Sequence, residues 1–107
     1  MTKRYRPSVF GVGGRDSNEP HITAVLDRYH VPYVLMPPQA GFDLLVFVSP
    51  LECWEVKNPE YKWSLTKAEK ERLDYCKRIG IKYRVIEMMD QAVDALTAIH
   101  GRKEVNP

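Results

Sequence analysis

Two acids and a lysine form the pattern in this sequence that is best suited to chemistry. Asp43 precedes the apolar run Leu44-Leu45-Val46, and Glu55 and Lys57 flank Val56. Alternate residues of a strand point to one face, so Glu55 and Lys57 would project together, and a hairpin would bring Asp43 beside them. Charged groups next to apolar runs are costly to bury without compensation. A divalent metal ion would compensate both acids.

The predicted ligands suit Mg²⁺, which prefers oxygen atoms and keeps several waters. They are Asp43, Glu55 and the backbone carbonyl of Val56. Such a metal would polarise a phosphoryl oxygen and lower the pKa of a bound water, while Lys57 orients that water and offsets charge developing on the phosphate. The reaction indicated is phosphodiester hydrolysis. The alternative is a solvated strand face on which Glu55 and Lys57 form an ion pair.

Glu19 is a fourth candidate for the catalytic and metal-binding set. It extends the inward stripe of a helix expected over residues 19–30, in register with Ile22 and Leu26. An inward glutamate needs a partner, and a metal ion or a water on a metal ion is one. The alternative is a favourable interaction of the acid with the helix dipole in the first turn.

The elements that must position these residues follow from the apolar periodicity. The helix over 19–30 has Pro20 in its first turn and Ser17 or Asn18 as its cap, and its apolar face comprises Ile22, Val25, Leu26 and Tyr29. Strands are predicted over 31–36, 43–48, 52–57 and 81–87, a second helix runs from a Thr66–Glu69 capping box to Gly80, and a last helix follows Asp90 with Val93, Leu96 and Ile99 inward. The predicted fold class is α/β, in the order αβββαβ(α), with a mixed sheet flanked by helices.

Length and charge indicate one domain with a basic arm. The 107 residues suffice for one hydrophobic core, which we place over 19–100, with a C-terminal tail over 101–107. Residues 1–18 carry four cations against Asp16, so they hold +3 and the remainder, given the total of +2, sums to −1. This segment is a basic arm or a solvated tail. Gly11-Val12-Gly13-Gly14 lacks the GK[ST] and GxGxxG patterns and is read as a flexible loop rather than a phosphate loop.

Other features exclude several classes of protein. No apolar run is long enough to span a membrane and no signal segment follows Met1, so we expect a cytoplasmic protein without a membrane partner. Cys53 and Cys76 are too few for a disulfide framework or a zinc site and are expected as reduced thiols, with Cys53 a small buried residue. His21, His30 and His100 have no metal-ligand spacing.

Taken together, residues 17–99 resemble the PD-(D/E)XK nuclease superfamily, in particular its VRR-NUC and Holliday-junction-resolvase branches. The similar segments are Gly41 to Val46, Trp54-Glu55-Val56-Lys57, and Leu65 to Glu69. The resemblance implies a restriction-endonuclease-like core, Mg²⁺ or Mn²⁺ dependence, Asp43, Glu55 and Lys57 as catalytic residues, and Glu19 as the acid of the first helix. The chain departs from the pattern at Phe42, where a proline is usual, and at Glu69, where glutamine is frequent, and it lacks the Val-Arg-Arg triplet.

Several residues are candidates for holding a nucleic acid. Tyr61 and Lys62 mix an aromatic ring with a cation, as single-strand binders do. Trp63 either shares that role or covers the edge of the core, and we favour the core. Met88-Met89 is expected to be core packing. The remaining candidate contacts are Lys67, Lys70 and Arg15, and Lys77 can share an outer helix face with the first two.

The sequence therefore predicts a Mg²⁺-dependent deoxyribonuclease that acts on branched or structured DNA. One small domain buries little DNA, so we expect a homodimer. An RNA endonuclease is an alternative, because the metal site treats both backbones alike. A non-catalytic nucleic-acid-binding module is the other, although two clustered acids gain nothing from facing a polyanion.

Overall fold

The computed structural model describes residues 17–104, and of residues 99–104 it describes the backbone alone. Residues 1–16 of the basic arm, which include the glycine cluster and Arg15, lie outside the described residues. No helix in the described part is both long and apolar enough to cross a membrane. The elements in chain order are α1 (Glu19–Arg28), β1 (Tyr33–Leu35), the 3-10 helix η2 (Pro38–Ala40), β2 (Leu44–Val46), β3 (Glu52–Val56), α2 (Lys67–Ile79), β4 (Lys82–Ile86) and α3 (Met89–Glu104).

The four strands form one mixed sheet in the order β1-β2-β3-β4. β1, β2 and β3 are antiparallel neighbours, with Leu44 opposite Trp54 in the register of β2 and β3. β4 returns parallel to β3 after the crossover through α2, which places Glu55 opposite Val85. The element order αβββαβα and the mixed sheet confirm the predicted fold class.

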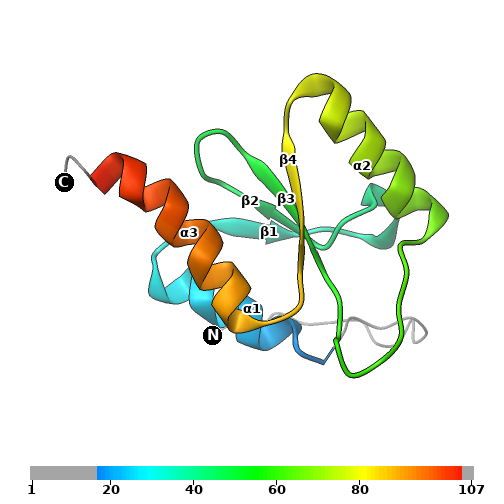
Figure 1. The fold of residues 1–107 in the computed structure, drawn as a ribbon, viewed down its shortest axis with the longest axis horizontal. Coiled ribbons are helices and arrows are strands. Elements are labelled where there is room, and N and C mark those ends of the chain that lie inside the picture. The colour runs from blue at the N-terminus through cyan, green and yellow to red at the C-terminus, as the bar shows by residue number, and fades with distance from the viewer. Residues whose placement is uncertain (1–16, 105–107) are drawn as a thin grey trace.

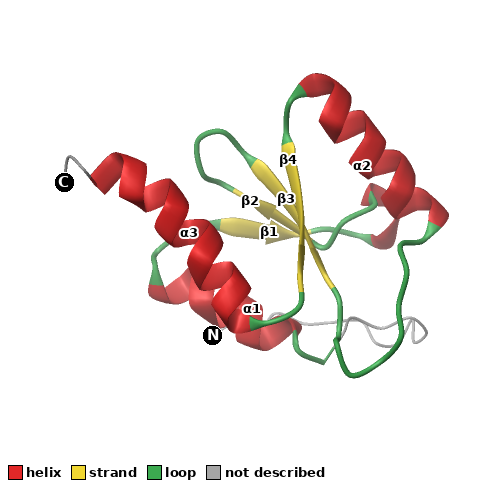
Figure 2. Cartoon of the chain, in the orientation of Figure 1, coloured by secondary structure: helices red, strands yellow, loops and turns green. Residues whose placement is uncertain are grey.

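Helices cover both faces of this sheet (Figures 1 and 2). Alternate side chains of β3 divide between the faces, because successive residues of a strand point in opposite directions. Trp54 and Val56 join the larger core with the apolar stripes of α1 and α3, whereas Cys53 packs against Cys76 of α2 in a smaller core with Phe42. The Glu55 side chain points to the same face as Cys53, so the candidate site residue Glu55 lies on the α2 side of the sheet.

The ends of α2 follow the predicted local rules. The Thr66 side chain accepts a hydrogen bond from the Glu69 N–H, and the Glu69 carboxylate accepts one from the Thr66 N–H, which completes the capping box. Gly80 ends the helix in the left-handed conformation, at φ +81°. α1 has Pro20 in its first turn as predicted, but its cap differs. Asn18 occupies the cap position and makes no side-chain cap, because its amide donates to the carbonyls of Lys57 and Glu87.

Other differences concern boundaries and exposed methionines. The strands are shorter than predicted. Residues such as Pro32 and Lys57 make a backbone hydrogen bond to a neighbouring segment but lie just outside the strands. α3 begins at Met89, so Asp90 lies in the first turn instead of capping it, and Ala92 and Ala95 are buried beside Leu96. The helix continues to Glu104, into the segment expected as a tail. Met88 and Met89 are exposed, so the prediction that they pack in the core is wrong.

Candidate active site

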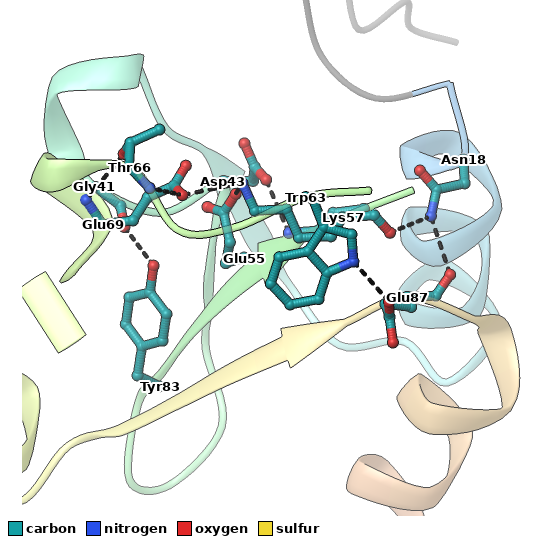
Figure 3. Close-up of polar contacts among 11 residues, drawn as sticks. Asn18, Gly41, Asp43, Glu55, Lys57, Trp63, Thr66, Glu69, Tyr83 and Glu87 are labelled. Carbon is teal, nitrogen blue, oxygen red and sulfur yellow. Dashed lines mark hydrogen bonds and ion pairs between the residues drawn. The ribbon is translucent and has the colours of Figure 1, made fainter. Parts of the chain in front are cut away.

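Asp43 lies immediately before β2, near the last residues of β3 and close enough to Glu55 to affect its charge. The Asp43 N–H donates to the Trp54 carbonyl at 3.0 Å, which ties Asp43 to β3 directly next to the last paired residue of β2, Leu44. The Val56 N–H donates to Asp43 Oδ2 at 2.8 Å. A backbone hydrogen bond therefore fixes one acid beside the other (Figure 3).

Glu55 is a buried acid in an unfavourable electrostatic position. Only 3% of the residue is exposed. Burial, followed by the negative charges of Asp43 and Glu69, raises its pKa to about 9, although the nearby Lys57 acts in the opposite direction. The alternative of a solvated strand face is therefore wrong for Glu55, while the ion pair with Lys57 is present, at 3.3 Å between Nζ and Oε2.

Lys57 lies between two glutamates. Its Nζ donates to Glu69 Oε1 at 2.9 Å, and Glu69 comes from the first turn of α2. Burial lowers the pKa of Lys57, but the hydrogen bond to Glu69 and the charge of Glu55 outweigh it and raise that pKa above its ordinary value. Lys57 is thus a fixed cation held within reach of Glu55.

The backbone before Asp43 is held by close packing against α2. Gly41 has φ +82°, and a Cβ there would lie 2.7 Å from the Ala68 carbonyl oxygen and 2.8 Å from Arg72 Cβ. The Gly41 carbonyl accepts a hydrogen bond from the Tyr83 hydroxyl at 2.6 Å, and the Ala40 carbonyl accepts one from Arg72. The segment leading into Asp43 is therefore clamped between α2 and β4.

The donor set suits a hard divalent cation with few protein ligands. Asp43 and Glu55 offer carboxylate oxygens, and the mutual repulsion that helps to raise the Glu55 pKa would be relieved by a cation. Within residues 17–104, no three His, Cys, Asp or Glu side chains are arranged to hold a metal ion. An ion at this position would have the carboxylates of Asp43 and Glu55 as its protein ligands and water in the rest of its shell. A ligand role for the Val56 carbonyl stays a prediction, since the contact between Val56 and Asp43 is made by the Val56 N–H.

Glu19 is buried as predicted, with 1% of the residue exposed in the first turn of α1. It is not among the charges that chiefly set the pKa of Glu55, which are those of Asp43, Glu69 and Lys57. The inward orientation is confirmed, and its role in metal binding stays a prediction.

Of the two aromatic residues after β3, Trp63 is more exposed than expected. Trp63 does not cover the core: 40% of it is exposed, its Nε1 donates to Glu87 Oε2 at 2.8 Å, and its ring centroid lies 5.8 Å from Lys57 Nζ. The hydrogen bond to Glu87 holds the indole next to Lys57 rather than in the core. The other candidate contacts within the described residues, Tyr61, Lys62, Lys67 and Lys70, are exposed.

Sequence reasoning missed a contact that each of three residues makes. Glu69 was read as a helix-capping residue and also holds Lys57. Asn18 joins the backbone after β3 to that after β4. Glu87 anchors Trp63. The capping box gave a usable signal for Glu69, because it placed an acid at the start of the helix that follows the Glu55 strand. Comparison of the chain with family models, with curated proteins and with solved structures gave no match.

Proposed function

We propose that this protein is a metal-dependent nuclease that hydrolyses DNA phosphodiester bonds. The observation that carries the proposal is the convergence of Asp43 and Lys57, at the ends of two adjacent strands, on the buried Glu55. Two acids placed side by side at the cost of a strongly raised pKa indicate a site that is built for a cation.

Each side chain has a distinct task in this proposal. Asp43 and Glu55 would hold the cation together with the Val56 carbonyl. A divalent cation, when bound, supplies Lewis acidity: it polarises a phosphoryl oxygen and lowers the pKa of water. Lys57, fixed by Glu69, would offset the negative charge that develops on the phosphate in the transition state.

Glu69 acts as a positioning residue in this account. Its carboxylate has a lowered pKa, because the Thr66 N–H and Lys57 outweigh the effect of burial. It therefore remains charged and keeps the Lys57 ammonium in place. Glu19 is proposed as an additional acid that supports the cation from α1.

A substrate panel tests the proposal and separates its alternatives. Supercoiled, linear duplex, branched and single-stranded DNA, and RNA of matched sequence, are incubated with Mg²⁺, with Mn²⁺ and with EDTA. We expect metal-dependent cleavage of DNA, strongest on branched or structured forms. Cleavage of RNA alone would replace the proposal with an RNA endonuclease. Binding without cleavage under every metal condition would favour a non-catalytic module.

We also propose that the protein acts as a homodimer on DNA. A single chain of this size covers little of a duplex, and a branched or two-stranded substrate presents two equivalent strands. Light scattering at micromolar concentration, with and without DNA, should give twice the chain mass of 12.4 kDa for the protein component. A monomer under both conditions would remove this part of the proposal.

A further inference from the structure

We infer that Tyr61 and Trp63 form a stacking platform for an unpaired base next to the scissile phosphate. The location relative to the scissile bond rests on the proposed function, because the platform adjoins Lys57 in the candidate active site. The ligand is single-stranded nucleic acid, since bases in a duplex are already stacked and present no free face.

Exposure distinguishes these two rings from the aromatic residues of the core. Tyr61 is 68% exposed and Trp63 is 40% exposed, whereas Trp54 is fully buried and donates its indole N–H to Glu52. The two residues are separated by a single residue of sequence, in the connection between β3 and α2. The Tyr61 ring is thus largely open to a flat ligand, and Trp63 is partly open, with Lys57 over its ring.

Trp63 is held in place without being packed in the core. The hydrogen bond to Glu87 anchors the edge of the indole, and Lys57 Nζ lies 5.8 Å from the ring centroid (Figure 3). A ring fixed by its edge loses little further freedom when a base stacks on its face. The contact with Lys57 places the Trp63 ring beside the candidate active site.

The chain that leads to Tyr61 is also ordered by hydrogen bonds. Asn58 is buried; its carbonyl accepts from the Tyr61 N–H at 3.2 Å, and its side-chain oxygen accepts from the Glu60 N–H at 2.9 Å. The Lys57 N–H in turn donates to the Ile86 carbonyl. The platform is therefore tied to the strand that carries Glu55 and Lys57.

Cations outnumber exposed acids in the segment that carries the two rings. Lys62 lies between them in the chain, and Lys67 and Lys70 follow at the start of α2; all three are exposed, against the single exposed acid Glu60 in the segment 58–70. At Trp63 itself, Lys57 faces the ring and the carboxylate of Glu87 accepts from its N–H. Aromatic rings on which bases stack, together with cations that contact the backbone, are the combination used by proteins that bind single strands.

The test measures binding of a fluorescein-labelled oligothymidylate and of a duplex of equal length by anisotropy, with the full chain in EDTA. Trp63→Ala and Tyr61→Ala remove one ring each, and Trp63→Phe keeps a ring face but loses the N–H that bonds Glu87. Tyr75→Ala is the matched control, because Tyr75 is an exposed tyrosine on α2 whose ring contacts the cations of Arg72 and Arg78, as Trp63 contacts that of Lys57. Thermal denaturation checks that each variant is folded.

We expect each alanine variant of the platform to weaken single-strand binding about five- to 150-fold, while Trp63→Phe retains most of the affinity and Tyr75→Ala retains all of it. An oligonucleotide with abasic sites should bind the wild type more weakly, and Trp63→Ala should reduce that difference. Unchanged single-strand affinity in both alanine variants would overturn the inference even if the protein cleaves DNA. Single-strand binding that depends on both rings, in a protein that cleaves nothing, would refute the nuclease proposal alone.

Discussion

The carboxylate of Glu69 joins Lys57 to the first turn of α2. Its Oε1 atom accepts a hydrogen bond from Lys57 Nζ and another from the Thr66 N–H, both at 2.9 Å. One oxygen therefore serves a helix cap and the lysine of the candidate site. The position of Lys57 depends in this way on the docking of α2, the helix that carries the positioning residue Glu69.

Replacement of Glu69 should affect stability and activity together. Glu69→Ala should lower the free energy of unfolding by about 0.5–2 kcal/mol, because half of the capping box is lost, and should reduce the rate of cleavage because Lys57 is no longer held. Glu69→Gln keeps an oxygen acceptor and should be milder in both respects. Urea denaturation and a cleavage assay measure the two effects. Glu71→Ala, an exposed neighbour on α2, is the control; equal behaviour of Glu69→Ala and Glu71→Ala would contradict the shared role.

Gly41 and Gly80 form a matched pair for testing the clamp before Asp43. Both have positive φ, at +82° and +81°, but a Cβ at Gly41 would meet Ala68 and Arg72, whereas nothing lies within 4 Å of one at Gly80. Backbone strain should lower the free energy of unfolding of both alanine variants by about 1–2 kcal/mol. Overpacking should lower that of Gly41→Ala by about 1–3 kcal/mol more. Chemical denaturation followed by circular dichroism gives the comparison, and equal losses would show that the close approach has no energetic role.

The raised pKa of Glu55 predicts a pH-dependent stability. Its pKa rises from 4.5 to about 9 in the folded chain, so between these values the native state keeps a proton that the unfolded state releases. The contribution of Glu55 to the free energy of unfolding should therefore decrease as pH rises through this range and level off above about pH 9. Glu55→Gln should flatten the pH profile measured by urea denaturation. Glu60→Gln, at an exposed acid, should not; a Glu55→Gln profile parallel to the wild type would rule out the shift.

Metal binding should be coupled to the same proton. A cation at Asp43 and Glu55 requires the ionised form of Glu55, so Mg²⁺ affinity should increase with pH up to about 9, by as much as about tenfold per pH unit. Asp43→Asn removes one ligand charge and one of the causes of the raised pKa, so it should weaken binding and reduce the number of protons released. Calorimetry in two buffers of different ionisation enthalpy measures both. Binding by the wild type without proton release would argue against Glu55 as a ligand.

The parts of this structure that sequence predicted are those governed by local periodicity. The alternation along β3 correctly separated Glu55 from Trp54, the stripe of α1 placed Glu19 inward, and Thr66, Glu69 and Gly80 marked the ends of α2. These signals depend on residues that are close in the chain.

Contacts between distant residues were beyond the same reasoning. Trp63 donates its indole N–H to Glu87 outside the core. The Asn18 side-chain amide donates to the carbonyls of Lys57 and Glu87 and does not cap the helix. No local pattern encodes either partner, because each depends on how β3 and β4 are placed in the sheet. The strand lengths were overestimated for a related reason. Apolar residues continue after the end of β2 at Val46, but the Val48 N–H bonds back to the Val46 carbonyl and not to a neighbouring strand.

Mg²⁺-dependent cleavage of a branched DNA by the wild type, Lys57→Ala and Lys62→Ala tests the central claim most directly. Both substitutions remove one lysine from the same region, but Lys57 bonds Glu69 and pairs with Glu55, whereas Lys62 is exposed. The account predicts metal-dependent cleavage by the wild type, a loss of about 10²- to 10³-fold in the rate of Lys57→Ala, and at most a weaker apparent affinity in Lys62→Ala. Equal rates for the wild type and Lys57→Ala, or cleavage that persists undiminished in EDTA, would contradict it.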